Sequence, residues 1–319
     1  MGLLKRLLAL ASVALFIAIL SRIDSAKVLS IIFGADPVFY LFSILLLACL
    51  VSAKALKWKL VLQSMGSGIP FTEALRLFLI GLFIGNITPG KLGDFAKALY
   101  LRGSHGTAAG LASVLLDRVV DVGILIAFAF AGTVSFIWLY NVFVLPPALL
   151  LFALLVFSAG VFLMFREEYL KLILRPVFNA IVPDGQKARL SSGFSNAFKS
   201  IKSSVTKKEF WLSVAAGLLV WTISTMMFFA LSASISIGLS LWAVLLIFPV
   251  ISLVDILPVS FSGIGTRDAA LIFLLSFFSI GPEHAVALSM IFFFTGYILV
   301  SAAGFILFLL DPVDLKSFG

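Results

Sequence analysis

The stretch GNITPGKLGDFAKAL, from Gly85 to Leu99, interrupts a long apolar run with residues that break helices. Proline lacks a backbone N–H and clashes with the preceding helical turn, and glycine tolerates backbone angles that other residues avoid. Pro89, Gly90 and Gly93 therefore predict that one helix ends and another begins here. The first N–H groups of the second helix would have no partner within the helix, and such groups attract anions.

Charged side chains accompany this predicted break: Lys91, Asp94 and Lys97. A lysine beside free helix N–H groups favours an anion such as a phosphate. Asp94 has two interpretations, because a carboxylate in a first helical turn either caps the helix or contacts a ligand. A ligand that carries an amine as well as a phosphate would use both signs of charge.

A second stretch, DILPVSFSGIGTRDAAL from Asp255 to Leu271, repeats the pattern. It combines the same kinds of residue: Pro258, Gly263, Gly265, Arg267 and Asp268. Asp268 has the same two interpretations as the acid of the first stretch. Short, Gly/Pro-interrupted apolar segments in corresponding places are typical of inverted repeats around a site at the membrane midplane. We therefore expect the two stretches to form halves of one site.

A third group of charges, in LLDRVVDVG, lies inside an apolar run. Asp117 and Asp121 are one helical turn apart on one face. An ionisable side chain within a membrane helix costs at least about 2.5 kcal/mol unless it is paired or hydrated. Two interpretations stay open for Arg118: it reaches lipid phosphates from a helix end at the interface, or it faces a cavity and is held by Asp117 or Asp121.

The elements that position these residues are membrane helices. Of the 319 residues, 62% are hydrophobic and 12% charged, and soluble domains have roughly 25% charged residues. A bilayer core requires about 20 apolar residues per helix. The qualifying runs are about 6–22, 37–55, 108–139, 147–165, 210–233 and 284–310, and two shorter runs, about 74–88 and 241–258, lead into the quoted stretches.

Basic residues predict the orientation of these helices, because positively charged loops stay in the cytoplasm. Their distribution puts both termini inside and requires two re-entrant hairpins, about 74–102 and 241–281. Residues 166–209 form a basic, amphipathic cytoplasmic segment between a first half, 1–165, and a second half, 210–319. The whole chain, 1–319, is then one all-α membrane domain in the plasma membrane. Lysines near Trp58 are expected to form an interfacial anchor: Lys54, Lys57 and Lys59.

Several classes of function lack a signal in the sequence. The single cysteine, Cys49, excludes an internal disulfide, and the two histidines, His105 and His284, do not stand at metal-ligand spacing. No nucleophile elbow, phosphate-binding loop or dinucleotide fingerprint is present. We therefore expect no enzymatic activity, no metal and no cofactor. The net charge of +8 reflects orientation in a membrane, not nucleic-acid binding.

Three motifs together resemble the transmembrane family of lysylphosphatidylglycerol synthase: PGKLGDFAKALYL, LLDRVVD and PVSFSGIGTRDAAL. The resemblance implies a flippase-like domain that carries a lipid across the bilayer, here as a stand-alone member without the soluble aminoacyl-transferase domain. Asp94, Asp117 and Asp268 replace the usual glutamates. The last helix, MIFFFTGYILVSAAG, lacks an arginine that many members have.

Charge pattern and resemblance lead to one functional expectation. The chain would translocate an anionic or zwitterionic phospholipid, or a polyprenyl-phosphate-linked lipid, through a central charged cavity. The expected partners are membrane lipids, a second copy in a homodimer, and a separately encoded lipid-modifying enzyme. Two alternatives stay open: a membrane enzyme that acts on polyprenyl phosphates, and a non-transporting scaffold for a lipid-synthesis enzyme.

Overall fold

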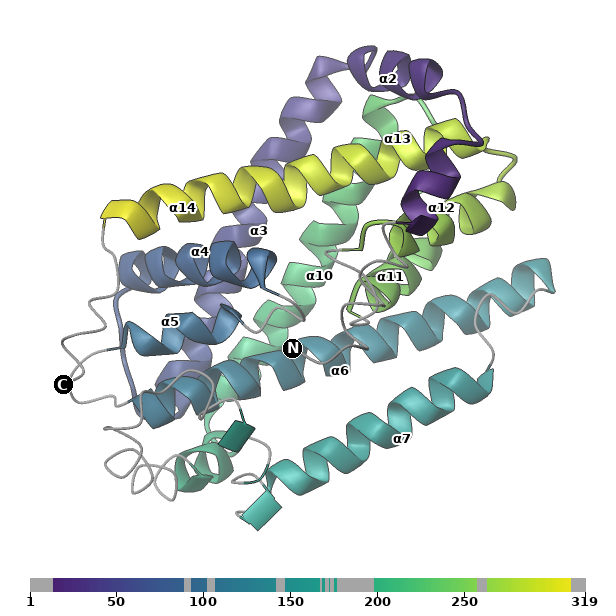
Figure 1. The fold of residues 1–319 in the computed structure, drawn as a ribbon. Coiled ribbons are helices and arrows are strands. Elements are labelled where there is room, and N and C mark those ends of the chain that lie inside the picture. The colour runs from purple at the N-terminus through teal and green to yellow at the C-terminus, as the bar shows by residue number, and fades with distance from the viewer. Residues whose placement is uncertain are drawn as a thin grey trace. The chain divides into compact units, whose positions relative to one another are not determined.

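The computed structural model describes residues 14–88, 93–101, 107–141, 147–166, 168–169, 172, 175–176, 198–256 and 263–310. All regular secondary structure within these ranges is helical, which confirms the all-α class (Figure 1). Pro89, Gly90, Lys91 and Pro258 lie outside the described residues, as does most of the segment 166–209.

Four helical stretches among the described residues are long and apolar enough to cross a membrane. They are α3 (Pro37–Ser64), α6 (Thr107–Tyr140), α10 (Lys208–Ser234), and a continuous run of α13 (Pro282–Phe293), η4 (Phe294–Leu299) and α14 (Val300–Leu310). At about 1.5 Å per residue each exceeds the ~30 Å thickness of the hydrocarbon core. Large apolar side chains such as Phe152, Trp138 and Leu310 are exposed on the helices, as lipid contact requires.

The shorter helices of the described chain include α2 (Ser25–Phe33), α4 (Phe71–Ile87), α5 (Ala96–Leu99), α7 (Pro147–Met164), α11 (Leu241–Ile256) and α12 (Thr266–Ser276). The α2 helix is additional to the predicted elements, and Asp24 caps it by accepting from the N–H of Lys27 at 3.1 Å. Both Pro/Gly segments separate two short helices, as predicted. The α4 helix contacts α5, and α11 contacts α12.

The chain divides into two compact units. Unit 1 comprises residues 1–50, 125–150 and 221–299, and unit 2 comprises residues 51–124, 151–220 and 300–319. Each long helical stretch therefore contributes one part to each unit.

The core of unit 1 is rich in aromatic rings. The rings of Phe228 and Phe248 have centroids 5.0 Å apart, and Phe292 meets Phe228 edge to face at 5.5 Å. Edge-to-face pairs bring the positive ring edge to the negative face of the partner. These contacts join α10, α11 and α13, and α13 also packs against α12 and α2.

In unit 2, α4 lies between α5 and α14, as Figure 1 shows. Gly304 permits the close approach of α14, because a Cβ at this position would collide with the carbonyl oxygen of Leu79 and lie 2.8 Å from the Cβ of Phe83. Small residues commonly allow such contacts between membrane helices. Asn86 adds a hydrogen bond of 3.0 Å from its amide nitrogen to the hydroxyl of Ser301.

Replacing Gly304 by valine should lower the stability of the protein by about 1–3 kcal/mol, because the added side chain forces α14 away from α4. Thermal unfolding of the detergent-solubilised protein measures the effect. The control is Gly160→Val in α7, where no heavy atom of the described residues outside the adjacent part of the same helix lies within 4 Å of the new Cβ. Equal losses in the two variants would contradict the close packing.

Candidate functional site

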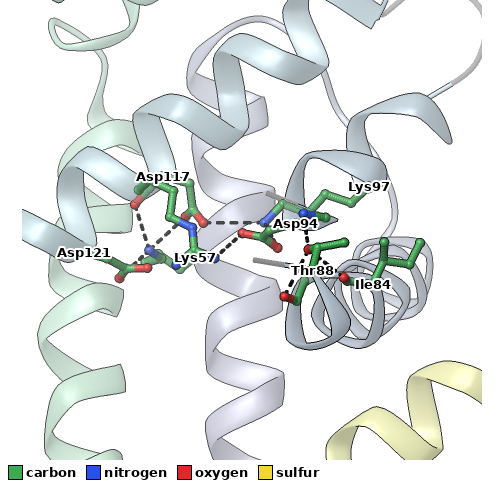
Figure 2. Close-up of polar contacts among 10 residues, drawn as sticks. Lys57, Ile84, Thr88, Asp94, Lys97, Asp117 and Asp121 are labelled. Atoms are coloured by element: carbon green, nitrogen blue, oxygen red, sulfur yellow. Dashed lines mark hydrogen bonds and ion pairs between the residues drawn. The ribbon is translucent and has the colours of Figure 1, made fainter. Parts of the chain in front are cut away.

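A buried lysine on α3 forms the centre of a charged network in unit 2. The ammonium nitrogen of Lys57 lies 2.9 Å from Oδ1 of Asp117 and 2.6 Å from Oδ1 of Asp121, both on α6. It also donates to the backbone carbonyl of Asp117 at 3.2 Å. Figure 2 shows Lys57 between the two carboxylates. The side chain of Lys57 is only 1% exposed, so these oxygens replace water around its charge.

Asp94 holds the second part of the network together. Its Oδ2 accepts a hydrogen bond of 2.6 Å from the guanidinium of Arg118, and its Oδ1 lies 3.3 Å from the ammonium of Lys97. Lys97 is in turn 3.7 Å from Asp117 Oδ2, which connects the two parts (Figure 2). Three cationic and three anionic side chains therefore form one balanced set, which we call the ion network: Lys57, Lys97, Arg118, Asp94, Asp117 and Asp121.

Aromatic faces surround the buried end of the ion network. The ammonium of Lys97 lies 4.9 Å from the ring centroid of Trp58 and 4.6 Å from that of Phe78, within the range of cation–π attraction. The indole N–H of Trp58 donates to the hydroxyl of Ser113 at 3.1 Å, which ties α3 to α6.

The segment that follows the first break is held against α4 by small residues and one hydroxyl. A Cβ on Gly81 would lie 3.2 Å from the Cβ of Lys97, and one on Gly85 would lie 3.3 Å from the backbone nitrogen of Asp94. Thr88 donates to the carbonyl of Ile84 at 2.8 Å and accepts from the N–H of Gly93 at 2.7 Å (Figure 2). These contacts fix the backbone that carries Asp94.

A small cavity of about 70 Å³ adjoins the ion network. This volume is enough for several water molecules. Its lining combines α4 residues with charged residues: Phe78, Gly81, Leu82, Gly85 and Asn86, and Lys54, Asp94, Asp117, Arg118 and Asp121. Within the ion network, only Arg118 (34%) and Asp121 (25%) have substantially exposed side chains.

Unit 1 contains a different arrangement around Arg267 at the start of α12. Its Nε donates to the hydroxyl of Ser289 at 2.9 Å, and its Nη1 lies 3.4 Å from Oδ2 of Asp255. Tyr297 donates to the same Asp255 oxygen at 3.5 Å. The guanidinium is also 5.5–5.6 Å from the rings of Phe292, Phe293 and Tyr297. Arg267 is 1% exposed, so it fastens α12 to α13 and the end of α11.

Asp268 acts as a helix cap in this structure. Its Oδ2 accepts a hydrogen bond of 2.7 Å from the backbone N–H of Gly265, the residue just before α12. Gly263 and Gly265 both have φ of 82°, a left-handed conformation that favours glycine. The capping interpretation of Asp268 therefore agrees with the geometry.

Residues 6–304 match the family described as the lysylphosphatidylglycerol synthase TM region. The chain belongs to this family. A UPF0104 membrane protein of Methanocaldococcus jannaschii is 24% identical over 320 residues, which cover 95% of this chain and 94% of the relative. A UPF0104 membrane protein of Methanothermobacter thermautotrophicus is 22% identical over 301 residues, or 86% and 83% of the two chains.

Four of the seven ligand-binding residues predicted for this family member lie together in unit 2: Asp94, Lys97, Arg118 and Asp121. Arg267 and Asp268 lie in unit 1, and Lys91 lies outside the described residues. The predicted joint site of the two stretches stays a prediction. One detail differs from expectation, because Asp94 holds Arg118, whereas Asp117 and Asp121 bind Lys57.

The expected interfacial anchor is wrong for Lys57, because Lys57 and the neighbouring Trp58 are both fully buried. The sequence did indicate that Lys57 is buried, because it is a cation within an apolar helix. Its acidic partners are 60 residues or more further along the chain. Asp255, Ser289 and Tyr297 were also absent from the predicted site. Asp255 could have been selected as an acid at the end of an apolar run.

Replacing Lys57 by methionine should destabilise this family member by about 3–5 kcal/mol, because Asp117 and Asp121 then stay buried without their cation. Thermal unfolding in detergent measures the loss, and adding Asp121→Asn should restore part of it. Lys59→Met, on the same helix but partly exposed, is the control. A Lys57→Met protein as stable as the control would contradict the claim that Lys57 compensates the buried charges of Asp117 and Asp121.

Proposed function

We propose that the chain is a lipid translocase. It moves an anionic or zwitterionic phospholipid, or a polyprenyl-phosphate-linked lipid, across the membrane through a charged cavity. One observation carries the proposal: the ion network is buried among apolar helices and exposes Arg118 and Asp121 where a small cavity adjoins it. Buried ionisable groups of a membrane protein commonly mark the pathway of a polar substrate.

The physical task of a translocase is to replace water around a lipid headgroup while the tails stay in the bilayer. A charged group moved into hydrocarbon without partners costs several kcal/mol or more. A balanced set of fixed charges can accept the headgroup and give it up again by exchange of ion-pair partners. Arg118 is suited to a phosphate, because a guanidinium presents several N–H donors in a fixed plane.

The proposed topology has six membrane spans and two re-entrant hairpins, with both termini on the cytoplasmic side of the plasma membrane. The four long apolar stretches support it, together with two pairs of short helices at the Pro/Gly breaks. The cavity would open alternately toward either leaflet, driven by the lipid gradient or by a coupled ion. We propose no catalytic activity; a separate lipid-modifying enzyme would supply the substrate, and a homodimer is the proposed assembly.

A leaflet-resolved assay in liposomes tests the proposal. The purified chain is reconstituted with reporter lipids of several headgroups, and their transbilayer movement is compared for the native protein and Arg118→Gln. The variant should slow transport at least about tenfold, because it loses a charge-assisted bond to the phosphate. Asp94 keeps its ion pair with Lys97 at 3.3 Å in this variant, so the protein should still fold.

Two controls make a negative result informative. A known scramblase, reconstituted in parallel, establishes that the assay detects movement, and Arg76→Gln removes a cation that does not line the cavity. If no headgroup moves, or if both variants transport at the native rate, the translocase proposal fails. The scaffold alternative would then gain support.

A further inference from the structure

The two exposed charges of the ion network have opposite signs and lie on the same side of one helix. Arg118 and Asp121 are three residues apart on α6, so their side chains leave neighbouring positions of the helix surface. Both line the cavity, and the other four members of the network are at most 4% exposed. A ligand in the cavity therefore meets a guanidinium beside a carboxylate.

Each of the two groups keeps binding capacity for a ligand. One terminal nitrogen of Arg118 binds Asp94 at 2.6 Å, and a guanidinium has five N–H donors in all. Lys57 takes one oxygen of Asp121 at 2.6 Å, and an ionised carboxylate has about four acceptor sites on its two oxygens. The remaining donors suit phosphate oxygens, and the remaining acceptor sites suit an N–H or O–H donor.

The spacing of Arg118 and Asp121 limits how far apart these two ligand groups can be. Positions three apart on a helix have Cβ atoms about 5–6 Å apart, so a ligand that meets both side chains needs its donor joined to the phosphate by a short linker. Lys54 also lines the cavity and adds attraction for the phosphate. An ammonium is a stronger partner for Asp121 than a hydroxyl, because it adds the attraction between two opposite full charges to the hydrogen bond.

We propose that the cavity of unit 2 selects a zwitterionic phosphodiester headgroup with one primary ammonium, of the phosphoethanolamine type. Arg118 binds the phosphate and Asp121 accepts from the ammonium. For its biological meaning, this inference rests on the proposed function: it names the substrate class of the proposed translocase. A phosphomonoester brings no donor for Asp121, and a trimethylated ammonium has no N–H to donate.

Calorimetric titration of the purified full-length chain in detergent tests the selection without any transport. The probes are glycerophosphoethanolamine, glycerophosphoglycerol, glycerophosphocholine and inorganic phosphate. The native protein should bind the ethanolamine probe about tenfold more tightly than any of the other three. Asp121→Asn should remove this preference while retaining some binding, since Arg118 is intact. Glu73→Gln, an acid of α4 outside the cavity lining, should keep the native preference.

Stability and transport separate the possible outcomes. The thermal unfolding of Asp121→Asn is compared with that of Asp121→Glu, which restores the charge and should restore the preference. Equal or tighter binding of glycerophosphoglycerol, full competition by inorganic phosphate, or no binding of any probe would each overturn the inference. Ethanolamine-selective binding without lipid movement in liposomes would instead remove the translocase proposal and leave this one standing. Lipid movement without ethanolamine-selective binding would overturn this inference and leave the translocase proposal standing.

Discussion

The need to pair every ionised group inside an apolar helix bundle governs this structure. An unpaired charge in such surroundings is far more costly than any single packing contact, so each buried cation in the described part of the chain has its acid within reach. Lys57 has two carboxylates and a carbonyl, Arg118 has Asp94, and Arg267 has Asp255. These pairings join helices that are distant in sequence, and they decide which faces of α3, α6 and α12 turn inward.

The helix breaks serve the same requirement. Beyond the end of α4 at Ile87, Asp94 and Lys97 lie against the glycine face of α4 and within reach of α6. A continuous helix would carry these two charges away from the network. In unit 1, Gly263 and Gly265 allow the backbone to enter α12 with Arg267 directed at Asp255. Both breaks are therefore followed by charged side chains that lie beside a partner of opposite charge.

Much of this fold followed from elementary patterns in the sequence. The apolar runs predicted the long helices to within a few residues at most ends, and Pro/Gly clusters predicted the two breaks. The pairing of Asp117 and Asp121 on one face followed from helical periodicity. The identity of their partner did not, because Lys57 stands on another helix and periodicity says nothing about which helices are neighbours. For the same reason neither interpretation of Arg118 included Asp94, which lies on another segment of the chain.

The central claim is that the ion network opens to water at Arg118. A single cysteine measures this directly, in a Cys49→Ser background that removes the only native thiol. Arg118→Cys should react with a water-soluble, membrane-impermeant thiol reagent in intact membranes. Leu116→Cys on the same helix, at a position that is 1% exposed, should react only after denaturation. If neither cysteine reacts before denaturation, or if both react equally, the hydrated cavity at Arg118 is contradicted.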